Sequence, residues 1–104
     1  MARVEVISKT VSSAGTAEPL SASDLWVSWF VIEFKSSNSG ANVYRGDSDV
    51  DNTYPAVTSS KSFSWAIPRQ NQNLADWFID VDTSGDGVWV TYGTATSADR
   101  DINV

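Results

Sequence analysis

The chain has 104 residues, a length that fits one domain with one hydrophobic core. Thirteen acidic residues against seven basic ones give a net charge of −6, and without a Lys/Arg cluster the sequence lacks the positive surface that holds nucleic-acid phosphates. Histidine and cysteine are both absent, which excludes Ser/His and Cys/His nucleophiles, disulfides and most zinc and copper sites. We therefore expect a small protein that is not an enzyme and does not bind nucleic acid.

The beginning of the chain predicts a strand followed by turns. Val4 and Val6 alternate with charged residues, so we expect both valines on the buried face of a first strand. Residues 11–23 are small and include Gly15 and Pro19, which favours turns around one short edge segment. Residues 1–9 lack the apolar run of a secretory signal and no stretch is apolar enough for a membrane span, so we expect a soluble protein.

The strongest predicted strand covers residues 26–35, and it is apolar on both faces over its first half. One face carries Phe30, Ile32 and Phe34. The opposite face carries Val27, Trp29 and Val31. Since a single sandwich covers only one face of a strand, the second face requires a partner.

Further strands are predicted over residues 42–45, 62–67, 77–82 and 88–92. Residues 83–87 lie between the last two strands, and Gly85 and Gly87 would supply the positive φ angles of a tight hairpin turn. No window has helical amphipathicity. The sequence therefore predicts an all-β fold, a single antiparallel β-sandwich of jelly-roll type over residues 1–104, with 95–104 as a flexible or partner-bound tail.

Two acidic segments resemble parts of calcium loops, because oxygen ligands stand at alternate positions. The first contains Asp80, Asp82, Ser84 and Asp86, and the second contains Asp47, Asp49 and Asp51. The first segment has Thr91 where a calcium-binding helix-loop-helix would need a bidentate Glu, so we favour a hairpin whose Asp and Ser side chains cap their own backbone. For the second segment we favour a solvated acidic loop. No cofactor is expected, and calcium remains the alternative.

The first residue of the second acidic segment, Asp47, also ends the tripeptide Arg45-Gly46-Asp47, which integrins recognise on exposed turns. So short a motif arises by chance, and that is the favoured interpretation.

The five tryptophans divide by strand parity, since residues two apart share a face. Trp65 and Trp77 fall on predicted core faces. Trp29 and Trp89 fall on the opposite faces, where they are either exposed or part of a larger core. The sequence thus predicts a protein-interaction surface that consists of Val27, Trp29, Val31 and Trp89.

Six segments together resemble one family. They are VSSAGTAEPL (11–20), VIEFK (31–35), NSG (38–40), VY (43–44), GDSDV (46–50) and FIDVDTSGDGV (78–88). Their order and content over residues 11–93 resemble the small β-sandwich virion proteins of tailed bacteriophages. The resemblance implies a structural protein such as a capsid decoration (cement) protein. Such a protein would bind and stabilise the shell of the major capsid protein, associate as a homotrimer, and reside in the virion after assembly in the host cytoplasm.

The alternative from another class is a β-sandwich similar to carbohydrate-binding modules. Such modules stack exposed aromatic rings on sugar rings, and many contain a structural calcium ion. The tryptophans and the Asp-rich loops of this chain would serve both purposes.

Overall fold

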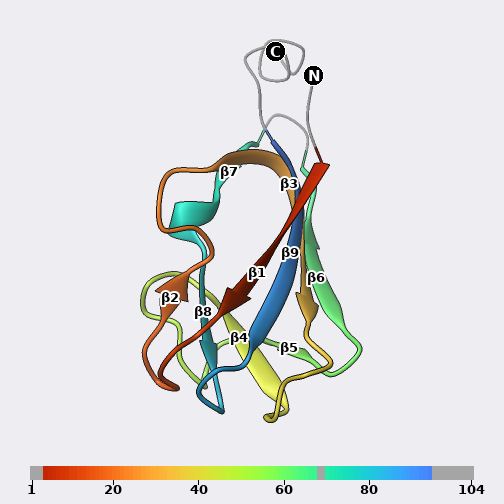
Figure 1. Cartoon of the computed structure of the whole chain (residues 1–104). Coiled ribbons are helices and arrows are strands. Elements are labelled where there is room, and N and C mark those ends of the chain that lie inside the picture. Colours follow the sequence, from red (N-terminus) through yellow and green to blue (C-terminus); the bar gives the residue numbers. More distant parts are fainter. Residues whose placement is uncertain (1–3, 68–69, 95–104) are drawn as a thin grey trace.

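Alternating apolar and polar side chains build an all-β structure, and the predicted antiparallel β-sandwich is confirmed (Figure 1). The structure is a computed structural model that describes residues 4–67 and 70–94. The described strands are β1 (Val4–Thr10), β2 (Glu18–Pro19), β3 (Trp26–Phe34), β4 (Asn42–Gly46), β5 (Ala56–Thr58), β6 (Ser62–Trp65), β7 (Gln72–Asn73), β8 (Phe78–Val81) and β9 (Gly87–Thr94), with a 3₁₀ turn η1 (Leu74–Asp76). The predicted tail, 95–104, lies outside the described residues.

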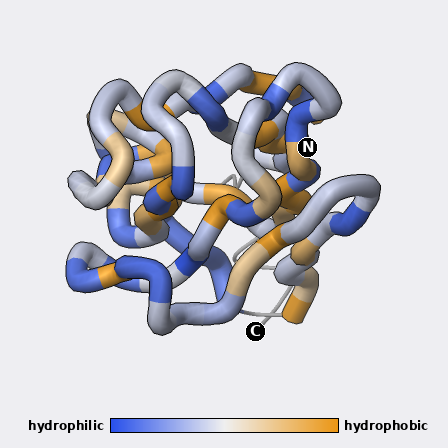
Figure 2. The backbone as a smooth tube through the Cα atoms, turned by 90° about the horizontal axis from the view of Figure 1, so that it is seen from below, coloured by the Kyte–Doolittle hydropathy of each residue, from blue (hydrophilic) through white to orange (hydrophobic). Residues whose placement is uncertain are grey.

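The strands form two antiparallel sheets. Sheet A has the order β1-β9-β3-β6, and β7 also pairs with β3, while sheet B has the order β2-β8-β4-β5. Figure 2 looks along the strands and shows hydrophilic segments in the surrounding loops and hydrophobic segments gathered between the layers. Side chains with no exposed surface fill this space: Val11, Val27, Phe30, Ile32, Val43, Leu74, Ile79, Val88 and Val90. Trp65 and Trp77 pack against this core, as predicted.

The hairpin predicted around residues 83–87 is wrong. β8 pairs with β2 and β4 in sheet B, whereas β9 pairs with β1 and β3 in sheet A, so the turn crosses from one layer to the other. Gly85 has the expected positive φ of +92°, but Gly87 does not. Gly87 is needed for another reason, because a Cβ there would lie 2.0 Å from the carbonyl oxygen of Lys9.

The orientation predicted for the first strand is also wrong. Val4 and Val6 are 65% and 58% exposed, whereas Ile7 packs on the core. The pairing with β9 decides this, since directly opposite residues share a face and Ile7 lies opposite the buried Val90.

A β-bulge in β3 corrects the prediction for Val27. The register with β9 shifts between Val27 and Trp29, which inserts Ser28 as an extra residue. Val27 and Phe30 therefore both face the core although they are three residues apart, and Val27 is fully buried. It does not belong to the outer surface that Trp29 occupies.

Candidate functional site

The outer face of sheet A gathers apolar side chains from three neighbouring strands. The register places Val4 of β1, Gly93 of β9 and Trp29 of β3 in one row, because each is paired with the next. The row beside it consists of Val6, Thr91 and Val31, and the third of Ser8, Trp89 and Glu33. We refer to Val4, Val6, Trp29, Val31, Trp89 and Thr91 as face A.

Face A is exposed as well as apolar. Val4, Val6 and Trp89 are 65%, 58% and 46% exposed, and Trp29 and Val31 are half-buried. Trp26, at the start of β3, is a further exposed tryptophan. In the described part of the chain, four of the five exposed large apolar residues thus lie on strands of sheet A, and the fifth, Ile67, follows β6. A concentration of this kind is typical of a surface that binds a partner.

Trp29 is held in place by a glycine. A Cβ at Gly93 would lie 2.2 Å from Nε1 of Trp29 and 2.8 Å from its Cε2, so the five-membered ring of the indole lies directly over Gly93. The missing side chain makes room for the ring, which covers the backbone of β9. Trp29 therefore forms part of a fixed surface.

Trp89 is held by a cation. The ammonium group of Lys35 lies 4.6 Å from the centroid of the Trp89 ring and donates a hydrogen bond to the hydroxyl of Ser8. Lys35 is only 9% exposed, and its charge attracts the electron-rich face of the indole. Both tryptophans of face A are thus oriented before any partner arrives.

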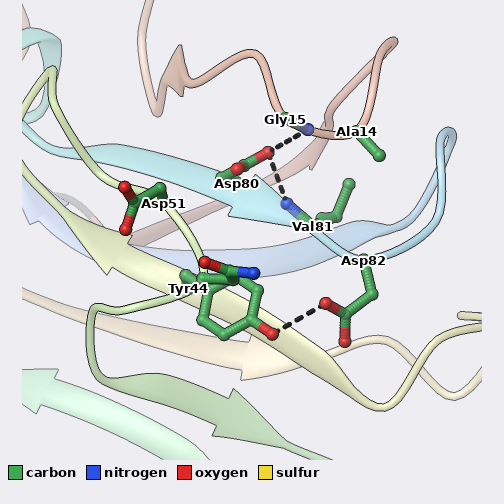
Figure 3. A pocket seen from close by; sticks show the side chains of 8 residues that line it. Ala14, Gly15, Tyr44, Asp51, Asp80, Val81 and Asp82 are labelled. Carbon is green, nitrogen blue, oxygen red and sulfur yellow. Dashed lines mark hydrogen bonds between the residues drawn. The ribbon is translucent and has the colours of Figure 1, made fainter.

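The outer side of sheet B is polar, in contrast to face A. A pocket of about 370 Å³ on this side is lined by Tyr44, Asp51, Asp80 and Asp82, among others (Figure 3). Asp80 is buried and accepts hydrogen bonds from the N–H groups of Gly15 (2.9 Å) and Val81 (2.8 Å). The hydroxyl of Tyr44 donates to Asp82 (2.7 Å), and this hydrogen bond raises the pKa of Tyr44 above its usual value.

The first acidic segment anchors loops from distant parts of the chain. Asp80 binds the loop after β1, Asp82 binds β4, Ser84 accepts from the N–H of Ala14, and Asp86 accepts from the N–H groups of Ser39 and Gly40. The predicted capping of the segment's own backbone is therefore found at the N–H of Val81 and is otherwise wrong, because the remaining donors belong to other loops and to side chains of β4. Among the residues with described positions, no group of three or more acidic side chains is arranged to hold a metal ion.

The second acidic segment caps its own loop. Asp47 accepts hydrogen bonds from the N–H of Asp49 (2.9 Å) and the hydroxyl of Tyr54 (3.1 Å), which raises the pKa of Tyr54. Asp51 accepts from the hydroxyl and the N–H of Thr53, and these bonds lower the pKa of Asp51.

Of the four predicted interface residues, the structure brings together Trp29, Val31 and Trp89 and excludes Val27. It adds Val4 and Val6, which sequence reasoning placed in the core. Alternation showed that Val4 and Val6 share a face, but not whether that face points toward the core or toward solvent. The pairing with β9 decides this, and the paired residues of β9 lie more than 80 positions away in the sequence. Their interface role stays a prediction.

Residues 4–67 and 70–94 include no helix with the length and apolar character that a membrane crossing needs. No protein-family model, curated protein or solved structure matches this chain.

Proposed function

We propose that this chain is a structural protein of a bacteriophage virion, a capsid decoration protein that docks on the major capsid protein through face A. The observation that carries the docking role is the exposure of Val4, Val6 and Trp89 beside the fixed ring of Trp29. The assignment to a virion rests on the resemblance of residues 11–93 to small virion proteins of tailed phages.

Face A has the properties of a docking surface. It is apolar at its centre, its aromatic rings are oriented, and aromatic anchors contribute most to the stability of protein interfaces. A stable interface buries at least about 1,000 Å² in total, and an open sheet face offers such a contact without a groove. Many copies bound to one shell would gain further from multivalency.

Self-association belongs to the same proposal. The resemblance implies a homotrimer, and β1 supports contact between copies because it is a seven-residue strand at the edge of sheet A. An edge strand offers unpaired backbone N–H and C=O groups to another chain. The proposed location is the virion, after assembly in the host cytoplasm, and no catalytic role is proposed.

The test is co-sedimentation with capsids that are assembled from the major capsid protein of the same genome. Wild-type protein should sediment with the capsids, and Trp89→Ala should lower its occupancy at least about tenfold, as loss of an interface anchor does. Asp49→Ala, on the exposed loop beside sheet B, is the matched control and should bind like wild type. Absence of wild-type protein from the capsid pellet would refute the proposal.

The exposed rings also support the second candidate, a carbohydrate-binding module, since Trp26 and Trp89 present 48% and 46% of their surface. Retention on a polysaccharide that Trp89→Ala abolishes, together with no capsid binding, would replace the virion assignment with this one.

A further inference from the structure

A second pocket lies at the end of β4, between the loop that follows this strand and the η1 turn before β8, and no residue of face A lines it. Its volume is about 400 Å³, a size that suits a small ligand. It is lined by Arg45, Gly46, Asp47, Tyr54, Pro55, Asp76 and Trp77. The tripeptide Arg45-Gly46-Asp47 thus lies in the wall of a pocket and not on a projecting turn.

Arg45 occupies an unusual position for a charged residue. It lies opposite the buried Ile79 and therefore on the inner face of sheet B. Its guanidinium group lies 3.7 Å from the centroid of the Phe63 ring of sheet A, and burial lowers its pKa. Within the described residues, its side chain has neither an ion-pair partner nor a hydrogen-bond acceptor.

A purely structural role would need only the stem and the flat face of this side chain, because these pack on Phe63. The five N–H donors of a guanidinium group radiate in its plane, so the ring below does not satisfy them. In the described part of the chain no buried side-chain nitrogen or oxygen lacks a partner, so the unpaired N–H groups of Arg45 are open to solvent. A ligand that supplies acceptors in the pocket would take the place of the water that solvates these donors.

The other walls define the chemistry of that ligand. Asp47 and Asp76 supply two carboxylates against one guanidinium, which disfavours an anion and calls for a ligand that also donates hydrogen bonds. Trp77 and Tyr54 supply aromatic surface. A neutral sugar satisfies all of these groups, because its hydroxyls accept from Arg45 and donate to the carboxylates while its C–H face packs on an aromatic ring.

The walls are also fixed in advance. The ring of Tyr54 lies against Gly46, where a Cβ would come within 2.5 Å of it, and its hydroxyl donates to Asp47. The indole N–H of Trp77 donates to the side chain of Gln72 (3.0 Å), and its ring contacts Phe63 at a centroid distance of 5.6 Å. Because these side chains are already ordered, ligand binding costs less conformational entropy than it would at a flexible site.

We propose that this pocket binds a neutral monosaccharide unit, with Arg45 and Asp76 as the polar recognition groups and Trp77 as the apolar wall. The site is separate from face A and does not depend on the capsid role.

The test is titration of ¹⁵N-labelled protein, followed by NMR, with methyl glycosides of glucose, galactose, mannose and N-acetylglucosamine. One of these should produce saturable shifts at the Trp77 indole and around residues 45–47. Asp76→Asn removes a charged acceptor and Arg45→Lys removes the planar set of guanidinium donors, so each should weaken its binding about tenfold. Asp76 is exposed, so the first variant should fold normally.

Trp89→Ala is the control, since it alters face A alone and should leave glycoside binding unchanged. Binding that Trp89→Ala removes and Asp76→Asn does not would move the sugar to face A and refute the proposal. So would acetate or sulfate binding that is tighter than glycoside binding, or the absence of shifts with every glycoside.

Discussion

Gly93 and Trp29 lie opposite each other on β9 and β3, and the structure makes each depend on the other. Because the indole occupies the space of a Cβ, Gly93→Ala should displace the ring and destabilise the fold by about 1–3 kcal/mol, as overpacking does. In a Trp29→Ala background the same change should cost far less. Urea unfolding of the wild type, the two single variants and the double variant measures the coupling free energy between Gly93 and Trp29. Additive effects would contradict the contact.

Phe30 and Trp89 show how differently two aromatic residues of one sheet contribute. Phe30 is fully buried and contacts Trp77 edge-on at a centroid distance of 5.0 Å, so Phe30→Ala should cost about 3–5 kcal/mol. Trp89→Ala removes a ring that is 46% exposed and should leave the protein folded, with a much smaller loss. Thermal and urea unfolding compare them. Unfolding of both variants would place Trp89 in the core and move the docking surface elsewhere.

At the scale of elements, the turn between β8 and β9 holds the two sheets and the loop after β3 together. Asp86 is 5% exposed and accepts the N–H groups of Ser39 (2.9 Å) and Gly40 (2.7 Å). Asp86→Ala should cost about 2 kcal/mol or more, because it removes two hydrogen bonds between a buried carboxylate and backbone N–H groups.

Chelation of calcium should leave the melting temperature of the wild type unchanged, since the carboxylates of this turn already accept hydrogen bonds from the protein. A marked fall in melting temperature with chelator would instead assign a cation to the acidic loops. It would also favour the carbohydrate-binding alternative.

The edges of the two sheets are joined by a salt bridge between Lys9 of β1 and Glu18 of β2 (2.8 Å). Lys9, and then the N–H of Ser12, hold the pKa of Glu18 below its usual 4.5. The stability that this carboxylate contributes is therefore present above pH 4.5 and lost as the pH falls through its folded pKa.

We therefore expect the wild type to lose more stability on acidification below pH 4.5 than Glu18→Gln, whose side chain does not titrate. Lys9→Met should reduce the same acid sensitivity, because it removes the main cause of the lowered pKa. Urea unfolding at a series of pH values tests this. Equal losses in all three proteins would mean that the salt bridge has no energetic role.

At the scale of the whole molecule, one outer surface is apolar and the other is covered by polar, acidic loops. This asymmetry and the open edge of β1 lead us to expect association of copies, as a trimer, in sedimentation velocity at high protein concentration. Val6→Lys places a charge on that edge and should shift the protein toward the monomer with an unchanged circular dichroism spectrum. A wild type that stays monomeric throughout would contradict the expectation.

The sequence by itself determined the fold class, the positions of the long strands and the shared face of Trp29, Val31 and Trp89. These follow from local alternation and from turn residues. Alternation alone gave wrong burial predictions in two places, because it shows neither a β-bulge nor which face of a strand points toward the core. A single extra residue at Ser28 reversed the face of Val27, and the direction of Val4 and Val6 depended on their pairing with β9.

Only the tertiary structure decided which sheet each strand joins. Residues 83–87 have the composition of a hairpin turn, yet β8 pairs with β2 and β4 in one sheet, and β9 pairs with β1 and β3 in the other. The pocket at Arg45 could not be predicted from the sequence either, because its walls come from separate segments of the chain. Arg45 and Trp77, the most distant pair, are 32 positions apart. Contacts between such segments depend on how the two layers pack, which no local pattern encodes.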